Sequence, residues 1–193
     1  RNDEEALSLI RHDCAHVMAE AVQNLFPGTQ VTIGPAIENG FYYDFARKEP
    51  FTEDDLVKIE EKMVELKGQD LSFEPSIVDR EEAVSFFHGQ GECLKTELIE
   101  ERTGQVLSCY KLGNLVDFCT GPHVLSTSHL GVFKLLSATP CSPLASHGQR
   151  YDSPRWCTHG TSQSTDLSKN SSAHGSAQVR KCAGLCPCLP RQH

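Results

Sequence analysis

Residues 11–22 read RHDCAHVMAEAV, and this stretch places a helix at the start of the chain. Its apolar residues recur every three or four positions, which is the spacing of a helix with one buried face. Asn2 or Asp3 can cap this helix. At roughly 100° per residue, His12 and His16 project nearly opposite the apolar stripe, so we expect both to face solvent or a cleft. The predicted buried stripe comprises Leu7, Ile10, Cys14, Val17, Ala21 and Leu25.

A cysteine and a histidine repeat the four-residue spacing much later in the chain, at Cys119 and His123. Thiolate and imidazole groups bind zinc, and an imidazole with a pKa of about 6.5 can also accept a proton from water. If the two pairs converge, they form one candidate site for a metal ion or for hydrolysis. The alternative for His12 and His16 is a pair of surface histidines, because the HxxxH spacing alone is weakly specific.

Charge divides this chain of 193 residues into two unequal parts. Residues 1–136 hold 24 acidic and 12 basic side chains, whereas residues 137–193 hold 2 acidic and 6 basic ones. The first part therefore has a net charge of −12 and the second a net charge of +4. An acidic segment lacks the basic surface that nucleic acids require, so we expect weak binding of nucleic acid by this chain alone.

The cysteines and the N-terminus indicate a reduced, cytoplasmic protein. Five of the nine cysteines lie in residues 137–193, and the other four show no spacing typical of a disulfide framework. No apolar run approaches the length of a membrane span, and the acidic N-terminus does not resemble a signal peptide. Because the chain starts directly in a helix, we expect that upstream sequence is missing.

Residues 30–136 combine helix patterns with strands that are mostly linked by hairpins, which predicts an α+β domain with an antiparallel sheet packed with helices. Thr52 begins a second helix, with Asp55 completing a capping box, and Asp79 with Glu82 predicts a similar box for a third. A fourth helix is expected at 92–101. The expected strands are 30–33, 41–45, 73–78, 105–112, 115–119 and 132–136.

Residues 137–193 carry neither a helical nor an alternating apolar pattern. They are rich in Ser, Thr and Pro and contain no Glu. Such a segment buries too little apolar surface to offset its chain entropy, so we expect an irregular, disordered tail. Our hypothesis is that this tail is a frameshifted or misassembled end, which retranslation in the other two reading frames can test.

Three strings in order carry a family resemblance. RHDCAHVMAEAV at 11–22, IGPAIENGFYYDF at 33–45 and VDFCTGPHV at 116–124 resemble the editing domain of threonyl-tRNA synthetases, which is shared with alanyl-tRNA synthetases. The resemblance covers residues 1–136. None of the signature segments of a class II catalytic domain appears in the chain, so the resemblance implies an editing fragment without the aminoacylation domain.

The resemblance implies which residues form a hydrolytic pocket. By that match the catalytic residues are His12, His16, Lys95, Asp117, Cys119 and His123. Two positions depart from the family pattern. Leu94 stands where the family more often has an aromatic residue, which weakens the match at Lys95. Thr120 replaces a frequent Arg, which bears on a tRNA contact.

The implied reaction is hydrolysis of the ester of mischarged seryl-tRNA(Thr). The implied partner is the aminoacylated 3′ end of tRNA, and full-length relatives are expected to form homodimers through the catalytic domain that this chain lacks. No cofactor is required in the threonyl branch. The free-standing relatives resemble zinc proteins, so zinc held by His12, His16, Cys119 and His123 stays open.

Three other functions also fit the residues. The first is an alanyl-tRNA-type editing hydrolase, which shares the same four side chains. The second is a non-enzymatic binding module stapled by zinc. The third is a cysteine hydrolase with Cys119 as nucleophile and a histidine as base.

Overall fold

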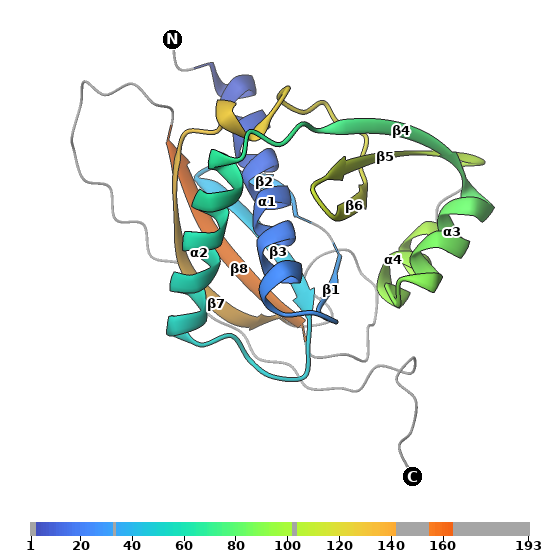
Figure 1. Cartoon of the computed structure of the whole chain (residues 1–193), viewed down its shortest axis with the longest axis horizontal. Helices are drawn as coiled ribbons and strands as arrows, with labels where there is room; N and C mark the ends of the chain where they lie inside the picture. The colour runs from blue at the N-terminus through green and yellow to red at the C-terminus, as the bar shows by residue number, and fades with distance from the viewer. Residues whose placement is uncertain (1–2, 33, 102–103, 142–154, 164–193) are drawn as a thin grey trace.

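The computed structural model describes residues 3–32, 34–101, 104–141 and 155–163, which form an α+β domain with two antiparallel sheets (Figure 1). The larger sheet has the order β1-β3-β8-β7, and β2 pairs with the start of β3. Its strands are β1 (Gln30–Val31), β2 (Ala36–Ile37), β3 (Gly40–Ala46), β7 (Val132–Cys141) and β8 (Arg155–Gln163). The smaller sheet contains β4 (Glu74–Asp79), β5 (Val106–Leu112) and β6 (Leu115–Phe118) in that order. The predicted fold class is confirmed.

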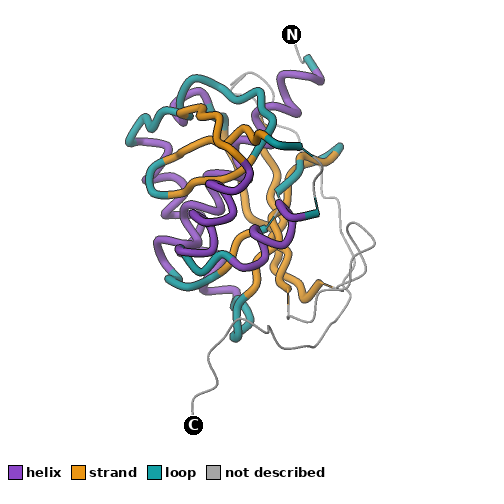
Figure 2. Tube along the Cα trace, turned by 90° about the vertical axis from the view of Figure 1, so that its right-hand side faces the viewer, coloured by secondary structure: helices purple, strands orange, loops and turns teal. Residues whose placement is uncertain are grey.

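Two helices cover one face of the larger sheet. α1 (Glu4–Leu25) and α2 (Glu53–Gly68) lie side by side against it (Figures 1 and 2). α3 (Arg80–Gly89) and α4 (Cys93–Glu100) pack together beside the smaller sheet. The main apolar core lies between α1, α2 and the larger sheet, and its largest fully buried side chains include Phe41, Tyr43 and Phe45 of β3.

The central turns of α1 are buried on every side. All residues from Asp13 to Val22 are buried, although the sequence pattern predicts only one buried stripe. The difference arises because β3 and α2 contact one side of the helix while β5 and β6 contact another. Leu25, which the pattern places in the stripe, is 37% exposed at the end of the helix.

A buried carboxylate joins α1 to the smaller sheet. The Glu20 side chain accepts hydrogen bonds from the backbone N–H groups of Asn114 (3.0 Å) and Leu115 (2.8 Å), at the turn between β5 and β6. Gly113 in that turn has a φ of 60°, and a Cβ there would lie 2.5 Å from the Glu20 carboxylate. The turn therefore needs glycine both for its backbone conformation and for this close approach.

The capping box predicted for the second helix is confirmed. Thr52 accepts from the backbone N–H of Asp55, and the Asp55 side chain accepts in return from the backbone N–H of Thr52. This arrangement satisfies two backbone donors that a helix start would otherwise leave unpaired.

The box predicted for the third helix is wrong. Asp79 stands at the N-cap position of α3, but its side chain makes no capping hydrogen bond. The start of α3 is held instead by Arg80, whose guanidinium donates to the carbonyl oxygens of Ile99 and Glu100 at the end of α4. This contact ties the start of α3 to the end of α4, but it pairs carbonyl oxygens of α4 and not the backbone N–H groups that the predicted cap would have paired.

The expected irregular tail contains strand residues. β7 extends through residues 137–141, and β8 at 155–163 lies between β3 and β7. The expectation of disorder is therefore wrong for these two segments. β8 pairs with β3 on one side and with β7 on the other. Backbone hydrogen bonds of this kind can hold a strand in a sheet even where its sequence has no alternating apolar pattern. The rest of the expected tail lies outside the described residues, and the domain boundary at residue 136 stays a prediction.

Within the described residues, no helix combines the length and apolar character needed to cross a bilayer.

Candidate active site

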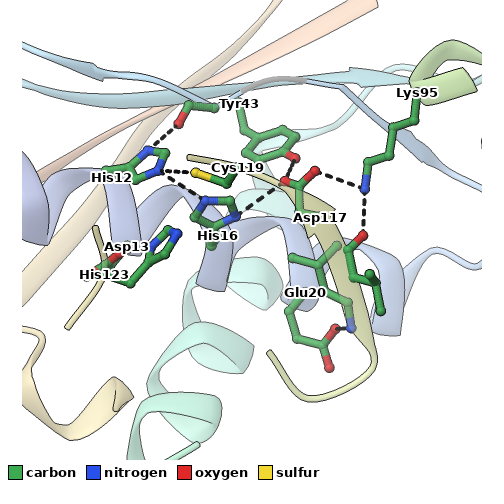
Figure 3. A network of polar contacts seen from close by, with 12 residues as sticks. His12, Asp13, His16, Glu20, Tyr43, Lys95, Asp117, Cys119 and His123 are labelled. Atoms are coloured by element: carbon green, nitrogen blue, oxygen red, sulfur yellow. Dashed lines mark hydrogen bonds and ion pairs between the residues drawn. The ribbon is translucent and has the colours of Figure 1, made fainter. Parts of the chain in front are cut away.

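Three parts of the fold bring the six predicted site residues together (Figure 3). α1 supplies both early histidines, α4 supplies Lys95, and β6 with the loop after it supplies Asp117, Cys119 and His123. The two sequence pairs converge as predicted, although 107 residues separate His12 from Cys119. One ligand atom from each of His12, His16, Cys119 and His123 lies within 4.8 Å of the others.

The imidazoles gather around the cysteine sulfur. His12 Nε2 lies 3.1 Å from Cys119 Sγ, and His16 Nε2 lies 3.3 Å from His12 Nε2. The His123 ring stacks on the His12 ring with centroids 5.1 Å apart and contacts the His16 ring edge-on. The thiol therefore faces three ring nitrogens within a small volume.

Each histidine uses its Nδ1 atom to contact a fixed oxygen. His12 Nδ1 lies 3.2 Å from the carbonyl oxygen of Gly34, and His16 Nδ1 lies 3.3 Å from Asp117 Oδ2. His123 Nδ1 lies 2.5 Å from Asp13 Oδ1. Carbonyl and carboxylate oxygens only accept, so each Nδ1 carries the proton and each Nε2 is directed towards Cys119.

Asp117 is the centre of a second group of polar contacts. Its carboxylate lies 3.2 Å from the Lys95 ammonium and accepts a 2.6 Å hydrogen bond from the Tyr43 hydroxyl. Lys95 also donates to the carbonyl oxygen of Val116, at 2.9 Å. Burial alone would raise the pKa of Asp117, but Lys95 and the His16 hydrogen bond hold it well below its usual range. Asp117 is therefore a buried carboxylate anion.

Cys119 and His16 form a charged pair. Burial alone would raise the pKa of Cys119, but the three imidazoles and the backbone N–H of Gly121, 3.3 Å from Sγ, lower it to about 4. Burial alone would lower the pKa of His16, but Asp117 and Cys119 raise it to about 9. A thiolate and an imidazolium therefore face each other at neutral pH.

A cavity of about 1100 Å³ opens beside this cluster. Its polar wall includes His12, His16, Asp117 and Cys119, and its other walls come from α1, the Gly34-Pro35 loop and β5. Lys95 and His123 do not line it. Both belong to the cluster through their neighbours, since Lys95 contacts Asp117 and the His123 ring contacts the other histidines. Four of the six predicted residues can therefore touch a molecule in the cavity.

Sequence reasoning missed two functional side chains. Tyr43 lies in an aromatic strand that indicates core packing, and only its partner Asp117 reveals the role of its hydroxyl. Asp13 follows His12 directly in the chain, but its partner His123 is 110 residues away. No local spacing predicts either contact.

The four ligand atoms suit a zinc ion in kind and nearly in distance. Zinc with nitrogen ligands at about 2.1 Å in a tetrahedron separates two nitrogens by about 3.4 Å, and the two Nε2 atoms of His12 and His16 lie 3.3 Å apart. A zinc-bound nitrogen and sulfur would lie about 3.6 Å apart, whereas His12 Nε2 and Cys119 Sγ lie 3.1 Å apart. Because the four ligand atoms spread over as much as 4.8 Å, the residues fit the ion in kind and would have to draw together to bind it.

A family model matches part of this site. The model of the threonyl and alanyl tRNA synthetase second additional domain matches residues 107–154, which include Asp117, Cys119 and His123. This match covers the late pair of the site.

Relatives among curated proteins extend the similarity to most of the chain. A threonine–tRNA ligase of Granulibacter bethesdensis is 54% identical over 138 residues, which is 70% of this chain and 22% of the relative. Threonine–tRNA ligases of Rhizobium johnstonii and Rhodospirillum rubrum are each 56% identical, over 70% and 69% of this chain and 21% of each relative. The chain therefore spans about a fifth of the length of these relatives.

Proposed function

We propose that the domain of this chain is an editing hydrolase, on the premise that about 70% of its length is similar to threonine–tRNA ligases. The proposed reaction is hydrolysis of the ester that joins serine to tRNA(Thr). The observation that carries the proposal is the convergence of His12, His16, Asp117 and Cys119 on one wall of a cavity.

Such a reaction meets a chemical need. Serine lacks one methyl group of threonine, and a binding pocket discriminates one methyl group by only about 1–3 kcal/mol. A second site that accepts serine and hydrolyses its ester removes the error. The cavity of about 1100 Å³ is large enough to admit an aminoacylated nucleoside.

His12 is our choice for the residue that orients the attacking water. Its Nδ1 atom contacts the Gly34 carbonyl, and its Nε2 atom faces Cys119 Sγ and His16 Nε2 at the cavity wall. A neutral imidazole at this position accepts a proton from water as water attacks the ester carbonyl, while His16 supplies the N–H that faces the thiolate. The His16 imidazolium, also on the wall, can then stabilise the negative charge on the carbonyl oxygen.

Asp117 is our choice for the residue that binds the substrate amine. It is a carboxylate on the cavity wall, and an ammonium group is its natural partner. Lys95 acts through Asp117, since it contacts that carboxylate and does not line the cavity. Lys95, which the resemblance places among the catalytic residues, is therefore proposed to position Asp117 without touching the substrate.

Deacylation of seryl-tRNA(Thr) by the full chain tests the proposal. Single-turnover rates are compared for the unaltered chain and for His12→Ala with His16→Ala, and threonyl-tRNA(Thr) serves as the control substrate. We expect the double variant to lose a factor of about 10² or more, the usual contribution of acid–base groups. Equal rates for both proteins, or equal hydrolysis of threonyl and seryl esters, would contradict the proposal.

Editing of the alanyl type predicts a different tRNA preference. The matching family model is common to threonyl and alanyl enzymes, so the tRNA body is the useful variable. Hydrolysis of seryl-tRNA(Thr) is compared with hydrolysis of seryl-tRNA(Ala). Faster hydrolysis of the tRNA(Ala) ester would favour the alanyl assignment.

A cysteine hydrolase is favoured by one observation, the low pKa of Cys119 beside three imidazoles. In that mechanism the thiolate attacks the ester carbonyl, the tRNA leaves, and water releases serine from the thioester. It predicts a trappable acyl-enzyme and complete loss of activity in Cys119→Ser. Residual activity in Cys119→Ser with no acyl-enzyme supports the water mechanism instead.

We propose that hydrolysis requires no metal, in line with the resemblance to the threonyl branch. If zinc binds, His12, His16, Cys119 and His123 would hold it, and it would supply a Lewis acid with a bound water of lowered pKa only where water replaces one of these four ligands. Metal analysis of the purified chain and activity after chelation distinguish the two cases. A zinc-stapled module without activity would instead unfold on chelation and hydrolyse no ester.

We also propose a cytoplasmic location, where tRNA is charged, and weak binding of the aminoacylated tRNA end. Tight tRNA binding and homodimer formation are assigned to segments of the relatives that lie outside this chain, since the chain spans about a fifth of their length.

A further inference from the structure

Asp13 is a buried acidic side chain whose ion-pair partner among the described residues is a histidine, His123, and not a Lys or Arg. It is fully buried in α1, and no Lys or Arg nitrogen among the described residues lies within 4.0 Å of its oxygens. Burial of a charge without a Lys or Arg partner is unfavourable, so a carboxylate at such a position needs a compensating role. Its partners indicate that role.

Both carboxylate oxygens of Asp13 contact the loop that carries His123. Oδ1 lies 2.5 Å from His123 Nδ1, and Oδ2 accepts a 2.9 Å hydrogen bond from the backbone N–H of Val124. The second bond fixes the plane of the carboxylate, which in turn fixes the direction from which Oδ1 approaches the ring. Figure 3 shows Asp13 and His123 meeting at the edge of the histidine cluster.

The His123 ring has apolar or aromatic neighbours on its other sides. Phe73 stacks on it with ring centroids 5.1 Å apart and planes within 1°, and Tyr110 approaches edge-on at 4.2 Å. His12 stacks on it from the cluster side. These contacts fix the plane of the ring but do not decide which nitrogen carries the proton. The Asp13 carboxylate is the contact that decides it.

The other ring nitrogen of His123 is directed to the cluster. Nε2 is buried and meets the geometric criteria for a hydrogen bond with no described residue, but the ring interacts with Cys119, and this interaction raises the pKa of His123 and lowers that of Cys119. Of the three carbonyl or carboxylate groups that hold Nδ1 atoms, only Asp13 can be changed without altering a second polar contact of the cluster. Gly34 contributes its backbone, and Asp117 also binds Lys95 and Tyr43.

We propose that Asp13 is a positioning residue for the reaction, which fixes the Nδ1–H tautomer and the orientation of His123 so that Nε2 faces Cys119. The inference rests on the proposed function for its kinetic consequence, but the tautomer itself is independent of any substrate. Asp13 touches neither the cavity nor the thiol, and it acts through His123 alone.

Asp13→Asn in the full chain is the direct test. The side chain in Asp13→Asn has one acceptor, its oxygen, and one donor, its NH₂ group. The oxygen is needed by the Val124 N–H, so the NH₂ group turns towards His123 Nδ1. Nδ1 must then accept, which favours the tautomer with the proton on Nε2. Nitrogen-15 NMR of the ring, at a pH where it is neutral, reports which nitrogen is protonated. We expect Nδ1–H in the unaltered chain and mainly Nε2–H in Asp13→Asn. Asp13→Glu retains an acceptor and should restore Nδ1–H, and exposed Asp54→Asn is the matched control.

Kinetics provide the second measurement. In single-turnover hydrolysis of seryl-tRNA(Thr), Asp13→Asn should lower the rate constant by about 10²-fold, because a turned His123 ring displaces the two histidines and the cysteine that it contacts. The half-saturating enzyme concentration should stay within about threefold, since substrate does not contact Asp13. Partial recovery in Asp13→Glu is expected, and Asp54→Asn should match the unaltered chain.

The outcomes separate the two proposals. An Nε2–H tautomer in the unaltered chain, or an unchanged tautomer in folded Asp13→Asn, overturns the positioning role, and the first of these needs no variant to fold. An altered tautomer together with a rate within about threefold of the unaltered chain also overturns it. If the unaltered chain hydrolyses no seryl ester but the tautomer changes as expected, the proposed function fails while the assignment of Asp13 to His123 stands.

Discussion

Asp117 shows how single residues shape this site. Its carboxylate faces a cation, a phenol and an imidazole at once, from α4, β3 and α1. Removal of one partner leaves a charge that is almost fully buried and lacks one of its contacts. Breaking such a buried pair is far more destabilising than loss of a surface ion pair.

Lys95→Met should destabilise the fold by about 3 kcal/mol or more, because it leaves Asp117 buried without its cation. Urea unfolding measures the effect. The control is Lys58→Met on the exposed face of α2, which should change stability by less than about 1 kcal/mol. Lys95→Met combined with Asp117→Asn should lose less than the sum of the single losses. Simple additivity would show that the two residues are not coupled.

Cys119 should react with iodoacetamide at unusually low pH. Its folded pKa of about 4 lies below the ordinary thiol value, so the thiolate persists as pH falls and declines only near pH 4. Burial raises the pKa of Cys14 to about 12 and that of Cys109 to about 11, so both should react slowly at neutral pH. Peptide mapping after a short pulse distinguishes the three. In urea all should follow one profile with a midpoint of about 8.5, and the same midpoint for folded Cys119 would contradict the expected shift.

At the scale of the element, the Gly34 loop depends on a close approach. A Cβ at Gly34 would lie 2.1 Å from the Tyr43 ring, which is fully buried and donates to Asp117. The Gly34 carbonyl meanwhile holds His12. A side chain here would therefore displace either the tyrosine or the loop, and each holds part of the site.

Gly34→Ala should cost about 2 kcal/mol, the usual effect of overpacking, and should lower hydrolysis as well. Thermal unfolding and seryl-tRNA deacylation measure the two effects. Gly68→Ala is the control, because a Cβ there meets nothing within 4 Å and alanine favours the helix. Equal stability of the two variants would show that the loop yields without strain.

Sequence pattern predicted those elements whose cause is local. Thr52 and Asp55 are three residues apart and cap α2 as expected. The turn at Gly113-Asn114 joins β5 and β6 as expected. Asp79 and Glu82 have the same spacing as Thr52 and Asp55, but the Asp79 side chain makes no capping hydrogen bond. The next residue, Arg80, instead donates to a carbonyl oxygen at the end of α4. β8 lacked a local signal altogether, since neighbouring strands place it.

At the scale of the whole molecule, the site combines segments that are far apart in the sequence. Local spacing identifies the two residue pairs but not their meeting. Four-residue spacing singled out His12 with His16 and Cys119 with His123, and their convergence needed the resemblance. Asp13 and Tyr43 were beyond prediction because their partners lie 110 and 74 residues away. Their roles follow only from three-dimensional contacts.

The net charge of the whole chain predicts weak affinity for tRNA. At −8 overall, the chain offers few cations to replace the counterions of the phosphate backbone. We expect a Kd above about 10⁻⁶ M at physiological salt. Fluorescence anisotropy with labelled tRNA measures it, with a full-length threonine–tRNA ligase as the positive control. Nanomolar binding by this chain would contradict our proposal that tight tRNA binding depends on segments of the relatives that lie outside this chain.

The contact of Glu20 with the β5–β6 turn reaches beyond its own neighbourhood. The helix that carries this carboxylate also carries both early imidazoles, and the strand leaving the turn carries Asp117 and leads to Cys119. A slip of one position along that strand would leave two backbone N–H groups without an acceptor and turn Asp117 to the opposite face of the sheet. Glu20 thus sets the register of the strand relative to the helix, and its loss would misalign the two halves of the proposed site.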